Sequence, residues 1–104
     1  IPCVLIVTTD VTSFLYPNER NQCWIDGGMF LMSLVYALHS KTLGTCCLNW
    51  SKNRQLDRAL RENISIPQRE AVICMLGVGA IPDTLEVAAS PRRPLNTVIR
   101  EIIE

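Results

Sequence analysis

The order of hydrophobic and polar positions divides the chain into three apolar runs separated by more polar segments. Residues 1–9 are almost continuously apolar and rich in β-branched side chains, which predicts a buried strand. The shorter run at residues 45–50 predicts a second strand. Residues 71–81 are apolar at nearly every position, so we expect a third strand in the middle of a sheet. Residues 10–21 are more polar and contain proline, which is typical of a loop.

Two other segments predict helices. Residues 22–43 contain no proline, and their apolar positions cover more than one helical face, so we expect a helix that is buried on several sides. Gly44 follows as a C′ glycine would. Residues 52–62 predict a second helix that begins at a Ser51 N-cap. Asn63 can take the left-handed conformation that closes this helix.

The elements follow in the order strand, helix, strand, helix, strand, and then a tail at residues 95–104 with helical or extended character. This order predicts one α+β or α/β domain over residues 1–104, in which helices cover the faces of the sheet. A chain of 104 residues is long enough for one small core. Its hydrophobic content of 48% against 19% charged residues indicates apolar surface for a partner subunit or another part of the polypeptide.

The charges exclude several classes of partner. Lys plus Arg and Asp plus Glu both total 10, so no basic field favours nucleic acid or an anionic membrane surface.

The most apolar stretch, residues 24–38, is too short and too interrupted for a membrane span, and we expect a soluble protein. Five cysteines without a CxxC spacing predict inert core thiols in a reducing cytoplasm. We expect His39 to interact with a helix C-terminus, and no metal to be bound.

Three segments, taken in order, resemble the C-terminal half of the nitroreductase family. The predicted long helix ends in LGTCCL at residues 43–48, which is similar to the family's helix, turn and short strand. Residues 56–67 are similar to its next helix and the Ile-Pro element after it. The strand at residues 72–79, followed by Pro82 and by RRPL at residues 92–95, is similar to the family's ending.

The resemblance implies a nitroreductase-like α+β homodimer that holds FMN at the dimer interface. It also implies a ping-pong oxidoreductase, in which NAD(P)H reduces FMN and the flavin then reduces a nitroaromatic, a quinone or a related acceptor. The cofactor would supply the chemistry, and the protein would supply binding and orientation. The chain would be the C-terminal portion of such a domain, in a cytoplasmic protein.

The resemblance also indicates which residues would bind the cofactor. The family passes the residues after its second strand beside the isoalloxazine ring, and a tail arginine reaches the FMN phosphate. The corresponding residues of this chain are Leu48, Asn49, Trp50, Ser51, Arg92 and Arg93. A guanidinium suits a phosphate, and backbone N–H groups at a helix start suit the flavin edge. No side chain is assigned a catalytic role.

Some of these positions allow two interpretations. Asn49 replaces the proline often found there, and Trp50 is either a flavin neighbour or a buried aromatic at a strand end. Ser51 suits a helix cap better than a flavin ligand. Gly77 and Gly79 predict close approach of another element, for which we favour a packed helix.

The main departure from the family is the lack of its N-terminal Arg-Ser-x-Arg stretch, which contributes to phosphate and ribityl binding. Because the chain starts at Ile1 without methionine, an excised fragment is the simplest interpretation, inactive alone and weak in FMN binding. One alternative function is a non-catalytic nitroreductase-like interaction module. Another is a different flavin reaction, such as dehalogenation or oxidation of a peptide-derived ring. A hydrolase is disfavoured because no GxSxG is present.

Overall fold

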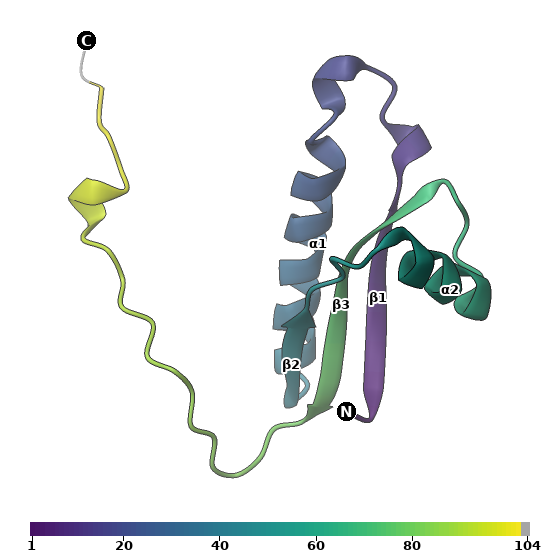
Figure 1. The fold of residues 1–104 in the computed structure, drawn as a ribbon. Coiled ribbons are helices and arrows are strands. Elements are labelled where there is room, and N and C mark those ends of the chain that lie inside the picture. The colour runs from purple at the N-terminus through teal and green to yellow at the C-terminus, as the bar shows by residue number, and fades with distance from the viewer. Residues whose placement is uncertain (103–104) are drawn as a thin grey trace.

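The computed structural model describes residues 1–102, which form a small α+β body followed by an extended tail (Figure 1). The strands are β1 (Cys3–Asp10), β2 (Leu43–Leu48) and β3 (Glu70–Ala80). The helices are α1 (Gln22–His39) and α2 (Arg54–Ile64). Short 3-10 turns lie at Val11–Ser13, Pro17–Glu19 and Leu95–Thr97. The observed order of elements therefore confirms the order predicted from the hydrophobic pattern.

The three strands form an antiparallel sheet in the order β1-β3-β2. The most apolar strand lies in the centre, as the sequence predicts. Leu76 in β3 lies opposite Leu5 of β1 and Cys47 of β2. Residues directly opposite in an antiparallel sheet point to the same face, and Leu76 is 0% exposed, so this row marks the covered face.

Helix α1 provides the cover. Gly27 is buried in α1, and a Cβ atom added there would lie 2.7 Å from Cγ1 of Ile73. The helix and the central strand therefore approach closely because this position has no side chain. The buried apolar residues of the core are Val7, Cys23, Leu76 and Val78. They come from β1, α1 and β3, so the core lies between this helix and the sheet.

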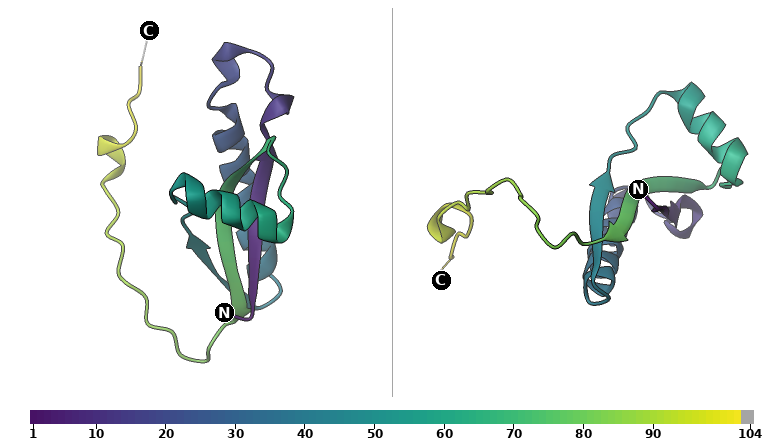
Figure 2. Two further views of the ribbon diagram at one scale, coloured as in Figure 1. Left: turned by 45° about the vertical axis from the view of Figure 1, so that its right-hand side comes forward. Right: turned by 90° about the horizontal axis from the view of Figure 1, so that it is seen from below.

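The opposite face of the sheet is much more open. In the row that alternates with the covered one, Val4 and Cys46 are exposed and only Gly77 in the centre is buried. In the covered row, Leu5 is half-buried beside Leu76, and only Cys47 at the β2 edge is exposed. Figure 2 places α2 on the side of the sheet away from α1, but α2 contributes no buried residue. The prediction of a sheet covered by helices is thus right for one face only. The two outer strands, expected to be buried, are half-exposed edge strands because only α1 packs closely on the sheet.

The ends of the first helix and the second strand differ from the prediction. Helix α1 ends at His39, which supplies the basic side chain of its last turn, as expected for this histidine. Thr42, with φ 60°, takes the left-handed conformation in the connection. Gly44 lies inside β2 and does not close the helix. The boundary is a polar turn of only three residues, Ser40, Lys41 and Thr42, which the prediction had included in the helix.

The second helix is also shifted along the chain. Its N-cap is Asn53, whose side-chain oxygen accepts the N–H of Leu56 at 2.9 Å, so the predicted cap at Ser51 is wrong. Its C-cap is Ser65 in the left-handed conformation, and Asn63 remains within the helix. Serine and asparagine are comparable N-cap residues, so residue type alone could not decide between Ser51 and Asn53.

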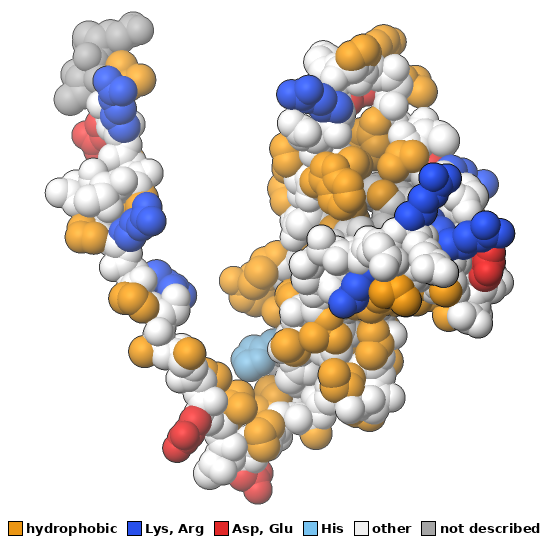
Figure 3. Space-filling view, in the orientation of Figure 1, with side chains coloured by type: hydrophobic (Ala, Val, Ile, Leu, Met, Phe, Trp, Pro, Cys, Tyr) orange, Lys and Arg blue, Asp and Glu red, His pale blue; other side chains and the backbone are white. Residues whose placement is uncertain are grey.

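Residues 81–102 run away from the body in an extended path with one 3-10 turn (Figures 1 and 3). The hydrogen bonds of this tail that involve side chains stay within it, from Arg92 to Ser90 and from Thr97 to Pro94. Within the tail predicted as extended or helical at residues 95–104, residues 95–97 form the 3-10 turn and the residues from there to 102 form no regular element. The last two residues lie outside the described part. No helix within residues 1–102 is long and apolar enough to cross a membrane.

Candidate functional site

Residues 48–51, which we call the flavin segment, connect the end of β2 to the approach to α2. Leu48 is the last residue of β2 and is half-buried. Asn49 and Ser51 are exposed, whereas Trp50 is half-buried. Four of the six predicted cofactor residues are therefore contiguous at one end of an edge strand.

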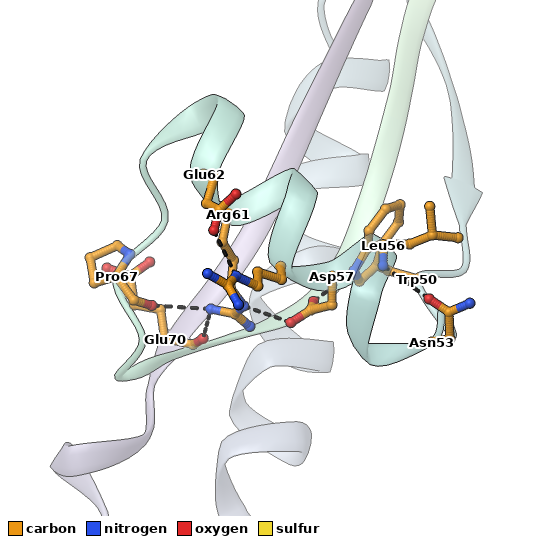
Figure 4. A network of polar contacts seen from close by, with 9 residues as sticks. Trp50, Asn53, Leu56, Asp57, Arg61, Glu62, Pro67 and Glu70 are labelled. Carbon is orange, nitrogen blue, oxygen red and sulfur yellow. Dashed lines mark hydrogen bonds and ion pairs between the residues drawn. The ribbon is translucent and has the colours of Figure 1, made fainter.

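Trp50 is held by a polar contact with the second helix. Its indole Nε1 donates a hydrogen bond to Oδ1 of Asp57 at 2.9 Å (Figure 4). Asn53 lies between them and caps the helix, so the segment enters α2 in a defined direction. A tryptophan that is partly buried usually satisfies its N–H in this way. The contact supports the structural interpretation of Trp50 as an aromatic at a strand end.

Arg61 extends this contact towards the central strand. Its Nε donates to Oδ2 of Asp57 at 2.7 Å, and its Nη1 donates to the carbonyls of Pro67 at 3.1 Å and Glu70 at 2.8 Å (Figure 4). We call Trp50, Asp57, Arg61, Pro67 and Glu70 the Asp57 network. The hydrogen bond from Arg61, and then the one from Trp50, lower the pKa of the Asp57 carboxyl. The network joins the end of β2, the helix and the start of β3.

The network borders a hollow of about 420 Å³ on one side of α2. The residues that line it are Arg54, Asp57, Arg58, Arg61, Glu62 and Gln68. Arg58 forms an ion pair with Glu62 at 2.7 Å, at the same spacing along the helix as the Arg61–Asp57 pair. The hollow therefore has mixed charge and no single electrostatic preference.

The two tail arginines lie apart from the flavin segment. Arg92 and Arg93 are exposed on the extended tail, which projects away from β2 and α2 (Figure 1). Arg92 Nη1 donates to the carbonyl of Ser90 at 3.2 Å and also contacts the Ser90 hydroxyl. The structure thus brings four of the six predicted residues together and leaves these two elsewhere.

The glycines of β3 are approached closely, but not by a helix. A Cβ atom at Gly77 would lie 3.3 Å from Cδ1 of Ile1, and one at Gly79 would lie 3.4 Å from Cδ of Pro2. The two residues before β1 therefore fold across the glycines of the central strand. Close approach was predicted correctly, and the helix that we favoured as its cause is wrong.

The cysteines are less buried than their apolar neighbours suggested. Cys23 is buried and Cys74 is half-buried, whereas Cys3, Cys46 and Cys47 are exposed. Loss of hydration, followed by the nearby Cys74 thiol, raises the pKa of Cys47. Within residues 1–102, no three His, Cys, Asp or Glu side chains gather as metal ligands. The expectation of core thiols fits Cys23 and fails for the three that lie on edge strands.

Asp57 and Arg61 were missed as part of the site. Their spacing of four positions on a predicted helix was the available signal, because such residues are neighbours on one helical face. The spacing could not indicate that Trp50 and the carbonyls of Pro67 and Glu70 also contact this pair.

Comparisons with known proteins agree with this architecture. No protein-family model and no curated protein sequence matches the chain. A solved structure described as a nitroreductase-like family protein from Bacillus cereus aligns with a TM-score of 0.70 at 15% sequence identity. The alignment covers 95% of this chain and 50% of that one, so the chain spans about half the length of its structural neighbour. The fold is therefore a nitroreductase-like α+β fold.

Proposed function

We propose that this chain is part of an FMN-dependent oxidoreductase of the nitroreductase type. In the proposed reaction NAD(P)H reduces FMN, and the reduced flavin passes its electrons to a nitroaromatic, a quinone or a related small acceptor. The observation that carries the proposal is the structural match over 95% of the chain to a nitroreductase-like protein. The sequence resemblance, found independently in three ordered segments, points to the same class.

The start of α2, which follows the flavin segment, offers hydrogen-bond donors that suit the flavin. The first N–H groups of an α-helix have no acceptor within the helix and carry a partial positive charge. Helix α2 begins at Arg54, directly after the flavin segment, and Asn53 satisfies only the N–H of Leu56 with its side chain. The remaining N–H donors would favour the charge that an isoalloxazine edge gains on reduction. The protein would hold and orient the ring, and FMN would supply the redox chemistry.

Arg92 and Arg93 are proposed as ligands of the FMN phosphate, provided that the tail can reach it. Because these arginines lie apart from the flavin segment, we expect FMN to bind weakly and the purified chain to be nearly colourless. Titration of the chain with FMN tests both statements. Weaker binding in the R92A/R93A double variant supports the phosphate role, equal affinity removes it, and a stoichiometric yellow preparation contradicts weak binding.

A homodimer formed through α1 is part of the same proposal. The side of α1 that faces away from the core exposes several large apolar side chains, among them Phe30 at 60% exposure. The exposed residues are Trp24, Ile25, Met29, Phe30, Met32 and Tyr36. Such a surface exceeds what a lone domain usually leaves in water. We expect self-association in light scattering, weakened by Phe30→Glu, and a strict monomer at high concentration would contradict it.

The separation of the arginines from the flavin segment favours one second candidate, a non-catalytic interaction module on the same fold. The two candidates differ in a longer parent protein. Under the first proposal, that protein oxidises NAD(P)H in the presence of FMN and an acceptor. Under the second, FMN has no effect on NAD(P)H, and the apolar side of α1 still binds a partner.

A further inference from the structure

We propose that Asp57 is a positioning residue that, together with Arg61, holds the flavin segment in place through Trp50. This role rests on the proposed function insofar as the flavin segment contacts FMN. The contacts that form the Asp57 network do not depend on it. Neither carboxylate nor guanidinium is assigned to the reaction itself.

The Asp57 network holds α2 in position because this helix buries little apolar surface against the sheet. No residue of α2 is fully buried. Of its leucine and isoleucine side chains, Leu60 is half-buried, and Leu56 and Ile64 are exposed. Apolar packing therefore contributes little to the position of this helix relative to the sheet. The hydrogen bonds of Arg61 to the carbonyls of Pro67 and Glu70 tie the helix to the start of β3. Without them, the helix and the segment before it would be held mainly by the chain itself.

The same network also holds the flavin segment, because Asp57 contacts both Arg61 and Trp50. Arg61 reaches the start of the central strand with one nitrogen and Asp57 with another, and the second oxygen of Asp57 accepts from Trp50. The Arg61 side chain is only 13% exposed, against 77% for Arg58 in its outward ion pair. Hydrogen bonds between charged partners away from water are stronger than exposed ones. The inward pair is therefore the one able to fix Trp50.

The charge of Asp57 makes the tie sensitive to acid. The charged groups around it are Arg54, Arg58, Arg61 and Glu62, all on α2, and β3 presents the Glu70 carbonyl to Arg61. The pKa of Asp57 is lowered from an ordinary value of 3.8, so the folded state favours the charged form. The stabilisation is therefore complete above the ordinary pKa and is lost as the pH falls through the lowered one. Protonation would release Arg61 and loosen the hold on Trp50.

Fluorescence of Trp50 tests the tie without any cofactor. The chain has two tryptophans, so the Trp24→Phe background leaves Trp50 as the only tryptophan, which is then excited selectively over the two tyrosines. At neutral pH we expect a red-shifted emission in the Asp57→Asn and Arg61→Gln variants, because the charge-assisted contact between positions 57 and 61 is lost and position 57 no longer fixes Trp50. Arg58→Gln, which breaks the outward pair at the same helical spacing, is the matched control and should leave the emission unchanged. Equal emission in all four proteins would overturn the proposal.

An acid titration of the same proteins gives a signature that a merely structural role would not produce. In the Trp24→Phe background, the emission should change with a midpoint below pH 3.8. In Arg61→Gln the midpoint should rise towards that value, because the largest cause of the lowered pKa is gone. In Asp57→Asn this transition should be absent. Circular dichroism over the same range separates it from global unfolding, and an unchanged midpoint in Arg61→Gln would contradict the network.

Binding of FMN connects the tie to the proposed function. With FMN as the probe, we expect about tenfold weaker binding in Asp57→Asn than in the unsubstituted chain, which corresponds to about 1.4 kcal/mol. Arg58→Gln should bind FMN as the unsubstituted chain does. Equal FMN affinity in Asp57→Asn, with its Trp50 emission shifted, would overturn the positioning role and leave the proposed function intact. If the unsubstituted chain binds no FMN at all, the proposed function is overturned and with it the role of Asp57 toward FMN. The Trp50 emission would still show whether Asp57 and Arg61 fix Trp50.

Discussion

The two helices are attached to the same sheet by different means. Helix α1 buries Cys23 and Gly27 against the strands, and Gly27 is so close to Ile73 that no side chain fits between them. Helix α2 has no fully buried residue and is tied to the start of β3 by the hydrogen bonds of Arg61. Figure 2 shows the two helices on opposite sides of the sheet.

This difference separates a rigid part of the molecule from an adjustable one. Apolar packing is non-directional and depends on area, so α1 and the covered face of the sheet should open only with the whole domain. A helix held by a few polar contacts can open locally at a lower cost. The flavin segment precedes the second kind of helix, and local adjustment there is compatible with the cofactor contact that we propose for this segment.

The largest effect should come from the packed side. Leu76 lies between Leu5 and Cys47 at the centre of the sheet with no exposed surface, and Leu76→Ala would leave a cavity in the core. We expect a loss of about 2–5 kcal/mol in the free energy of unfolding, measured by urea denaturation with circular dichroism. Leu85→Ala in the exposed tail is the control and should have no measurable effect. A loss of similar size in the control would show that the tail packs on the body.

The next effect concerns the polar side. Arg61→Gln removes the charge-assisted contact with Asp57 and leaves that carboxylate without its main partner. We expect a loss of about 1–3 kcal/mol in the free energy of local opening of α2, seen as faster amide hydrogen exchange in that helix. Arg58→Gln breaks a pair with the same 2.7 Å distance and helical spacing, but this pair lies in water. Its exchange rates should not change measurably. Equal effects of the two substitutions would mean that burial is not what distinguishes the pairs.

The same contrast explains how far the sequence carries the prediction. The order of elements and the central place of β3 followed from the hydrophobic pattern, because a strand that is apolar on both faces must lie inside a sheet. The pattern misled for the outer strands, since an apolar run does not tell whether a covering element is present. Residues 1–9 were expected to be buried, and β1 contains one buried residue, Val7.

The site was predicted less completely than the fold. The flavin segment was located by resemblance and lies at the strand end where it was expected, although its role in binding remains a proposal. The Asp57 network was not foreseen, because it requires Trp50, Asp57 and Arg61 to meet two backbone carbonyls. Backbone partners have no signature in a sequence. The position of the tail arginines also depends on where an extended chain runs, which local pattern does not determine.

A smaller effect should appear at the contact between α1 and β3. In Gly27→Ala, the new Cβ would lie within 3.0 Å of three atoms of Ile73. Because two of these atoms branch from the Cβ of that isoleucine, a rotation that moves one away brings another closer. We expect a net loss of about 1–2 kcal/mol in the free energy of unfolding, since overpacking exceeds the gain in helix propensity. An unchanged or increased stability would show that the helix can move away from the sheet at little cost.

The adjacent glycine gives the matched and smallest effect, with the opposite sign. Gly28 lies in the same helix, and a Cβ there would have no atom within 4 Å. Alanine is favoured over glycine in a helix by about 1 kcal/mol, because glycine loses more backbone freedom on folding. At chain concentrations low enough to keep the chain monomeric, Gly28→Ala should therefore raise the free energy of unfolding by about 0.5–1 kcal/mol in the same urea experiment. If it is destabilising instead, something covers this side of α1 in solution, and concentration-dependent stability would identify that cover as a second copy of the chain.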